Sequence, residues 1–138
     1  IIFYKRKINF IDESYNASPE TMKNCVSYFI DLEIKKNKKK VLILGDMKEL
    51  GKHELKFHVE ILNYVCQKKI ENVIICGELM QLALSKLNDN NILHMTNINE
   101  IFQYLKKILN NDDIILIKGS NSSLTNKLSE EFLKKGDF

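Results

Sequence analysis

The stretch Val41-Leu42-Ile43-Leu44-Gly45-Asp46 decides how this chain folds. Four consecutive aliphatic side chains predict a strand that is buried on both faces, and the glycine after them allows a sharp exit from it. A strand with two buried faces needs helices on both sides, so the stretch indicates a parallel α/β sheet. The apolar residues that follow have helical spacing: Leu55, Val59, Leu62 and Cys66.

Outward from this stretch, short apolar runs alternate with helical spacing along the whole chain. We expect strands over residues 1–4, 8–12, 41–44, 73–76, 92–95 and 114–117, the first two joined by a basic turn at residues 5–7. One helix should begin at Pro19 with Ser18 as its N-cap. The prediction is an α/β, Rossmann-like three-layer domain with a mostly parallel sheet of about six strands and helices on both faces.

Length and composition indicate one soluble globular domain. The chain has 138 residues, of which 44% are hydrophobic and 28% charged, and no apolar run approaches the roughly 18 residues of a membrane span. We therefore expect no membrane insertion. Residue 1 is Ile rather than Met, and residues 1–4 already have a strand pattern, so we expect a domain from a longer chain.

The charge pattern argues against a nucleic-acid partner. The net charge is +3, but among 21 basic residues only Arg6 is an arginine. Base readout and bidentate phosphate contacts favour arginine, and these lysines are mixed with acidic residues. We expect no nucleic acid as partner.

The cysteines predict neither a metal site nor disulfides. Cys25, Cys66 and Cys76 are odd in number, widely spaced and set among apolar residues. They lack the C-x-x-C spacing of zinc and redox sites, so we expect reduced thiols in a cytoplasmic protein and no bound metal.

In an open parallel sheet, ligands bind at the carboxyl ends of the strands. The segments that matter are therefore the loops at residues 13–18, 45–52, 77–79 and 118–123. None of them contains G-x-G-x-x-G.

The first loop runs from Asp12 to Pro19 and is dense in hydrogen-bonding groups. Acidic residues here are suited to ribose hydroxyls, and Tyr15 and Asn16 to a base or a substrate amide. The alternative is a capping loop, in which Asp and Ser side chains bind free backbone amides.

The second loop places Asp46 and Glu49 after the central strand, with His58 on the next helix. The two carboxylates are candidates for orienting an amine or a lysine. The alternative is an ordinary turn beside a hydrogen-bonded core histidine.

The third loop, from Lys118 to Ser123, ends the last strand and opens a helix. Lys118, the Ser120 hydroxyl and free backbone amides suit a carboxylate or a phosphate. A serine-rich N-cap would have the same sequence.

Together, the three loops resemble the C-terminal domain of the Mur ligases. The pattern D-D-S-Y-N-A-N-P-x-S-M corresponds to residues 12–22, L-G-D-M-x-E-L-G with a later histidine to residues 44–51 and His58, and K-G-S-R-S to residues 118–122. Within the family, the first two motifs are most similar to the ligases that join D-alanyl-D-alanine to UDP-N-acetylmuramoyl-tripeptide.

The resemblance implies a domain of residues 1–138 from an ATP-dependent amide ligase of peptidoglycan synthesis, and thus of cell-wall formation, cell shape and cell division. In such enzymes the tripeptide carboxylate is activated as an acyl phosphate, and ATP and Mg²⁺ are bound mainly by a central domain. That domain and an N-terminal UDP-sugar domain are absent from this chain. We expect the isolated domain to be inactive and the complete enzyme to be cytoplasmic and monomeric.

By position, the resemblance implies that Glu13, Tyr15 and Asn16 bind nucleotide and that Lys118 and Ser120 bind the acceptor. It implies supporting catalytic roles for three further residues: Asp46, Glu49 and His58.

The sequence departs from the family pattern at Glu13, Ser18 and Asn121. Asn121 stands in place of an arginine, which removes a fixed cation. Two alternatives therefore stay open: a degenerate ligase domain and a stand-alone Rossmann-like ligand-binding module.

Overall fold

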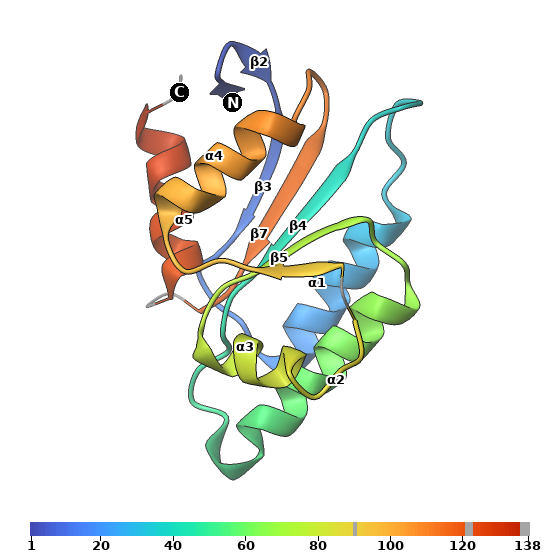
Figure 1. Ribbon diagram of the computed structural model, residues 1–138, viewed down its shortest axis with the longest axis vertical. Coiled ribbons are helices and arrows are strands. Elements are labelled where there is room, and N and C mark those ends of the chain that lie inside the picture. The colour runs from blue at the N-terminus through green and yellow to red at the C-terminus, as the bar shows by residue number, and fades with distance from the viewer. Residues whose placement is uncertain (90, 121–122, 136–138) are drawn as a thin grey trace.

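The computed structural model describes residues 1–89, 91–120 and 123–135 (Figure 1). In chain order, its elements are β1 (Ile2–Phe3), β2 (Arg6–Lys7), β3 (Asn9–Glu13), α1 (Pro19–Asp31), β4 (Lys40–Leu44), the 3₁₀ turn η1 (Gly51–His53), α2 (Glu54–Gln67), β5 (Asn72–Ile75), α3 (Glu78–Leu84), β6 (Ile92–His94), α4 (Ile98–Ile108), β7 (Ile114–Lys118) and α5 (Leu124–Lys135).

Five strands form one parallel sheet in the order β3-β7-β4-β5-β6. Helices α1, α2 and α3 cover one face, and α4 and α5 cover the other (Figure 1). The predicted three-layer α/β class is confirmed.

The prediction was wrong at the first strand and its turn. Residues 1–4 do not join the main sheet, because Ile2 and Phe3 pair antiparallel with Lys7 and Arg6 in a separate hairpin. Its turn is formed by Tyr4 and Lys5, whose φ angles are 47° and 63°. Two positive φ angles in succession give a turn that suits a two-residue hairpin, so Arg6 and Lys7 are strand residues.

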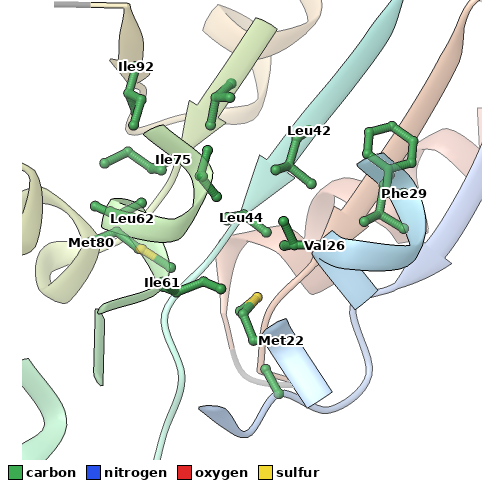
Figure 2. Packing of buried hydrophobic residues seen from close by; sticks show 14 of the residues in the cluster. Met22, Val26, Phe29, Leu42, Leu44, Ile61, Leu62, Ile75, Met80 and Ile92 are labelled. Atoms are coloured by element: carbon green, nitrogen blue, oxygen red, sulfur yellow. The ribbon is translucent and has the colours of Figure 1, made fainter. Parts of the chain in front are cut away.

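Alternate side chains of each central strand enter two different cores. On β4, Leu42 and Leu44 face α1–α3, whereas Val41 and Ile43 face α4 and α5. Figure 2 shows the first core, in which Met22, Val26 and Phe29 of α1 approach the two β4 leucines. Both faces of the strand are apolar because both are covered.

Helix α1 begins as predicted. Ser18 is its N-cap and accepts a hydrogen bond from the Thr21 amide at 3.2 Å, while the Thr21 hydroxyl accepts one from the Ser18 amide at 2.9 Å. Pro19 occupies the first helical position, where a missing N–H costs nothing.

A buried thiol at the end of β5 makes stability sensitive to alkaline pH. Burial, with smaller contributions from Asp46 and Glu100, raises the pKa of Cys76 from 9.0 to about 12. Below pH 9 the thiol is protonated in both the folded and unfolded states. Above pH 9 only the unfolded thiol ionises, so the free energy of unfolding falls as pH rises toward the folded pKa.

We expect Cys76→Ala to reduce this loss of stability at alkaline pH. Between about pH 9 and about pH 10.5 the wild type should lose about 1.5 kcal/mol more than the variant, measured by urea unfolding. Val73→Ala, which truncates a buried side chain on the same strand, is the control. It should lower stability equally at every pH, and equal pH slopes for wild type and Cys76→Ala would contradict the assignment.

Candidate functional site

The ends of β3, β7 and β4 bring the three loops singled out in the sequence to one edge of the sheet. Strand β7 lies between β3 and β4. Lys118 at its end is paired with Glu13 of β3 on one side and with Leu44 of β4 on the other. The loops that follow these strands therefore meet although more than 100 residues separate the first from the last (Figure 1). The topology assembles the predicted candidates at one place.

The first loop buries Ser14 and presents the side chains of Glu13, Tyr15 and Asn16 to solvent. Asp12 Oδ1 accepts hydrogen bonds from the Ser14 amide at 3.0 Å and the Ser14 hydroxyl at 2.6 Å, which folds the loop tightly. Glu13 and Asn16 are exposed, and Tyr15 is 77% exposed. A tyrosine this exposed contributes little to the core, so its ring is available to a ligand.

Lys118 connects this loop to the last strand. It is only 3% exposed, and its Nζ donates to the Asn16 carbonyl oxygen at 2.8 Å. Within the described part of the chain, no carboxylate lies within 4.0 Å of that Nζ. A buried lysine normally has an anionic partner, so this side chain is a candidate for binding one.

Ser120 joins the second and third loops. Its hydroxyl accepts a hydrogen bond from the Lys48 amide at 2.9 Å, and its amide donates to the Asp46 carbonyl oxygen at 3.0 Å. The hydroxyl proton has no acceptor among the described residues, which leaves it available to a ligand oxygen.

Asp46 has a structural partner for each carboxylate oxygen. Its Oδ1 accepts from the Met80 amide at 2.9 Å and its Oδ2 from the Leu79 amide at 3.2 Å. The carboxylate, 5% exposed, thereby caps α3 from a distant loop. Gly77 lets it approach, since a Cβ there would lie 2.6 Å from Asp46 Oδ2.

His58 is the hydrogen-bonded core histidine that the sequence left as an alternative. It is fully buried, its Nε2 accepts from the Met47 amide at 2.9 Å, and its Nδ1 donates to the Glu54 carbonyl oxygen at 2.6 Å. The ring fixes the second loop to α2. Glu49, at φ 60° on the same loop, is exposed.

The ends of β4 and β7 approach each other closely, which the sequence alone does not predict. Gly45 and Gly119 lie against Thr125 of α5: a Cβ on Gly45 would be 2.6 Å from Thr125 Oγ1, and one on Gly119 would be 3.1 Å from Gly45 Cα. The signal that was available is a glycine directly after each of β4 and β7. Asn121, the departure noted in the third motif, lies outside the described residues.

A cavity of about 520 Å³ opens beside these loops, between the ends of β4 and β5 and the starts of α3 and α5. Lys48 and Asp46 line it from the second loop, and Glu78 and Ser123 from the two helix starts. Its volume is in the range of small-molecule sites.

Among the described residues, no three His, Cys, Asp or Glu side chains are grouped so that they could hold a metal ion. None of the helices there has the length and apolar character that crossing a membrane requires.

The fold and this edge define a class: a parallel α/β domain with polar loops at the carboxyl ends of its strands, the place where such sheets bind ligands. Residues 2–121 match the family model described as Mur ligase, glutamate ligase domain. The chain belongs to this family.

The chain is similar to curated relatives over nearly all of its own length. It is 30% identical over 131 residues to the UDP-N-acetylmuramoyl-tripeptide--D-alanyl-D-alanine ligase of Bacillus subtilis, an alignment with 92% of this chain and 28% of that protein. It is 32% identical over 137 residues to the protein of the same name from Buchnera aphidicola of Acyrthosiphon pisum, covering 98% of this chain and 29% of the relative.

Solved structures share the fold. The MurF ligase of Thermotoga maritima, solved in complex with ADP, superposes with a TM-score of 0.75 at 22% identity, over 93% of this chain and 28% of that one. MurF of Acinetobacter baumannii gives a TM-score of 0.72 at 19% identity, over 91% of this chain and 27% of that one. The chain thus spans less than a third of each of these four proteins.

Proposed function

We propose that this chain is the C-terminal domain of an ATP-dependent ligase that joins D-alanyl-D-alanine to UDP-N-acetylmuramoyl-tripeptide in peptidoglycan synthesis. One observation carries the proposal. Lys118 is a buried lysine without a carboxylate partner among the described residues, placed where the three loops that match the family's motifs meet. It suits the carboxylate of an incoming amino acid or peptide.

The acceptor dipeptide ends in a carboxylate, and the end of β7 offers two groups for it. The Lys118 ammonium supplies a charge-assisted hydrogen bond, and the Ser120 hydroxyl supplies a second donor. Because Lys48 holds the Ser120 oxygen through its amide, the hydroxyl is fixed in position before the ligand arrives.

The proposal assigns nucleotide binding to the first loop. In the proposal, Glu13 accepts hydrogen bonds from ribose hydroxyls, and Tyr15 and Asn16 contact the base or its amide-like groups. All three are exposed, as a surface that meets nucleotide held by another domain requires. ATP would supply the phosphoryl group that activates the tripeptide carboxylate as an acyl phosphate.

The described residues offer no cluster of metal ligands. Since the chain spans less than a third of the relatives above, the proposal assigns Mg²⁺ and the triphosphate mainly to a central domain and the UDP-sugar to an N-terminal domain, both preceding Ile1 in a complete cytoplasmic, monomeric enzyme. On this proposal, residues 1–138 close over the reacting groups and keep water from the activated carboxylate.

The second loop has a positioning role in this scheme. Asp46 and His58 are occupied by backbone hydrogen bonds, so they hold the loop instead of acting on the substrate. Glu49 is the exposed carboxylate that remains at the tip of the loop, where it could orient the attacking amine.

The departure at Ser18 does not weaken the proposal. Ser18 forms a reciprocal cap with Thr21, and serine caps a helix about as well as the asparagine of the family pattern. A degenerate ligase therefore has no support from this position.

The test is an assay of the complete protein encoded by the gene. We expect it to contain G-x-x-G-K-T upstream of Ile1 and to form the pentapeptide and inorganic phosphate only when ATP, tripeptide and D-alanyl-D-alanine are all present. The 138-residue chain alone should form none. Calorimetry of the complete protein with an ATP analogue and D-alanyl-D-alanine is the second readout, and absence of both binding and product would contradict the proposal.

A further inference from the structure

The amino ends of the strands, opposite the candidate ligand edge, carry most of the positive charge of the chain. Four segments lie there: residues 5–7, 35–40, 68–71 and 106–113 (Figure 1). They hold 12 of the 21 basic residues but only three acidic ones, which gives a formal net charge of +9. The remaining nine basic and 15 acidic residues give −6. We call these four segments the basic face.

Polar contacts and a cavity join the four segments into one surface. The Lys7 carbonyl oxygen accepts a hydrogen bond from the Asp112 amide at 2.8 Å, and Lys35 Nζ lies 3.2 Å from Asp112 Oδ2. A cavity of about 320 Å³ connects residues 38–40 with residues 68–72. The fold therefore gathers on one side of the domain charges that the sequence spreads over more than 100 residues.

Part of this charge has a structural use. Arg6 donates to the carbonyl oxygens of Lys106 and Leu109 at the end of α4, at 2.6 and 2.8 Å. Lys40 donates in the same way to Ile30 near the end of α1, and cations at such positions complement the helix dipole. Five ammonium groups of the basic face, however, have no ion pair, hydrogen bond or ring contact within the described ranges: those of Lys7, Lys36, Lys38, Lys69 and Lys107.

The basic face also presents apolar side chains. Ile2, which is paired with Lys7 in the hairpin, is 44% exposed. Ile30, Ile34 and Ile70 line the cavity together with five lysines. Apolar groups among lysines suit the boundary between the headgroups and the acyl chains of a lipid membrane, whereas a nucleic acid or a free anion would gain little from them.

We propose that the basic face docks onto anionic lipid membranes. The free ammonium groups contact headgroup phosphates, and Ile2 and the cavity isoleucines meet the boundary with the acyl chains. Nucleic-acid recognition favours guanidinium groups, and Arg6, the arginine of this face, is already used by α4. The candidate ligand edge is at the other end of the strands, so the docked domain keeps that edge turned away from the lipid.

Vesicle flotation of the complete protein encoded by the gene is the test. The protein should bind vesicles of phosphatidylcholine with about 30% phosphatidylglycerol at least about tenfold more tightly than vesicles of phosphatidylcholine alone. Raising the salt from about 0.1 M to about 0.5 M should weaken this binding at least about tenfold, because salt screens exposed charges. Equal binding to both kinds of vesicle, or binding to neither, would overturn the inference.

A triple variant removes three of the free ammonium groups: Lys36→Gln, Lys38→Gln and Lys69→Gln. It should bind the anionic vesicles at least about 30-fold more weakly, since each lysine near an anionic surface adds to the affinity. Its thermal melt should match that of the wild type. Its rate of pentapeptide formation without vesicles should also be unchanged, because the basic face is remote from the candidate ligand edge. Failure of this inference therefore leaves the proposed function intact.

The matched control removes the same charge from exposed positions outside the basic face: Lys56→Gln, Lys86→Gln and Lys127→Gln. Its binding to anionic vesicles should weaken by less than about threefold, because only lysines that reach the lipid contribute. Equal losses in the two triple variants would show that net charge alone attracts the protein, and would overturn the basic face as the docking surface.

Two further measurements distinguish a membrane from other anions. Inorganic phosphate added at constant ionic strength should not release the protein from anionic vesicles, and release would show a site for the free ion instead. Ile2→Ser should weaken vesicle binding about threefold without changing its salt dependence, because it removes apolar contact but no charge. Unchanged binding of this variant would contradict the contact of Ile2 with the lipid.

Discussion

Gly119→Ala should lower the free energy of unfolding by about 3 kcal/mol, and the melting temperature by roughly 10 °C. The added methyl group would overlap Thr125 Oγ1 and come within 3.1 Å of both Gly45 Cα and Ser123 Oγ. Thr125 is fully buried, and the Gly45 contact is backbone, so neither neighbour can move away freely. The substitution therefore strains the contact between the ends of β4 and β7 and the start of α5.

Two further variants identify the cause. Gly51 has a positive φ of 68° but no neighbour within 4 Å, so Gly51→Ala measures conformational strain alone and should cost only about 1 kcal/mol. Thr125→Ala removes the closest contact and should recover part of the loss when combined with Gly119→Ala. Strict additivity of those two substitutions in urea unfolding would show that the crowding is not the cause.

Lys118→Met should lower kcat/KM for D-alanyl-D-alanine about 100-fold in the complete ligase, mainly through a higher KM. Methionine keeps the length of the side chain but removes the ammonium that the proposal assigns to the acceptor carboxylate. Stability should change by less than about 1 kcal/mol, or rise, because a buried cation without a carboxylate partner gives way to an apolar group. Steady-state kinetics and urea unfolding measure the two effects.

Lys40→Met is the matched control. Lys40 is the first residue of β4, and its Nζ also donates to a backbone carbonyl, that of Ile30 at 2.6 Å, but it lies at the opposite end of the sheet from Lys118. Its substitution should leave the dipeptide KM unchanged. If Lys118→Met matched this control in kinetics, or if it unfolded the enzyme, the assignment of Lys118 as an acceptor ligand would be wrong.

Much of the fold could be predicted because its signals are local. Runs such as residues 41–44 have no polar position, and Ser18 before Pro19 marks a helix start. The first hairpin could not be predicted in this way. Its turn depends on the positive φ of Tyr4 and Lys5, residue types that do not signal that conformation.

The position of the candidate site could be predicted from the sequence. Which of its side chains are engaged in hydrogen bonds with the rest of the fold could not. The rule that ligands bind at the carboxyl ends of parallel strands selects loops that the structure brings to one edge of the sheet. Which carboxylate is free depends on contacts between distant segments: Asp46 is taken up by the start of α3, whereas Glu78 stays open. The residue types alone do not distinguish the two.

The strand order has a consequence for how this domain forms during synthesis. Among the described strands, β3 pairs only with β7, which comes after it, β4, β5 and β6 in the chain, and β4 has β7 as one of its two neighbours. Until β7 has emerged from the ribosome, β3 lacks this partner and the central strand β4 lacks one of its neighbours. Lys118, Gly119 and Ser120 are made together with that strand, so the domain completes its sheet and its candidate ligand-binding edge in the same event, and a nascent chain that ends before β7 has neither.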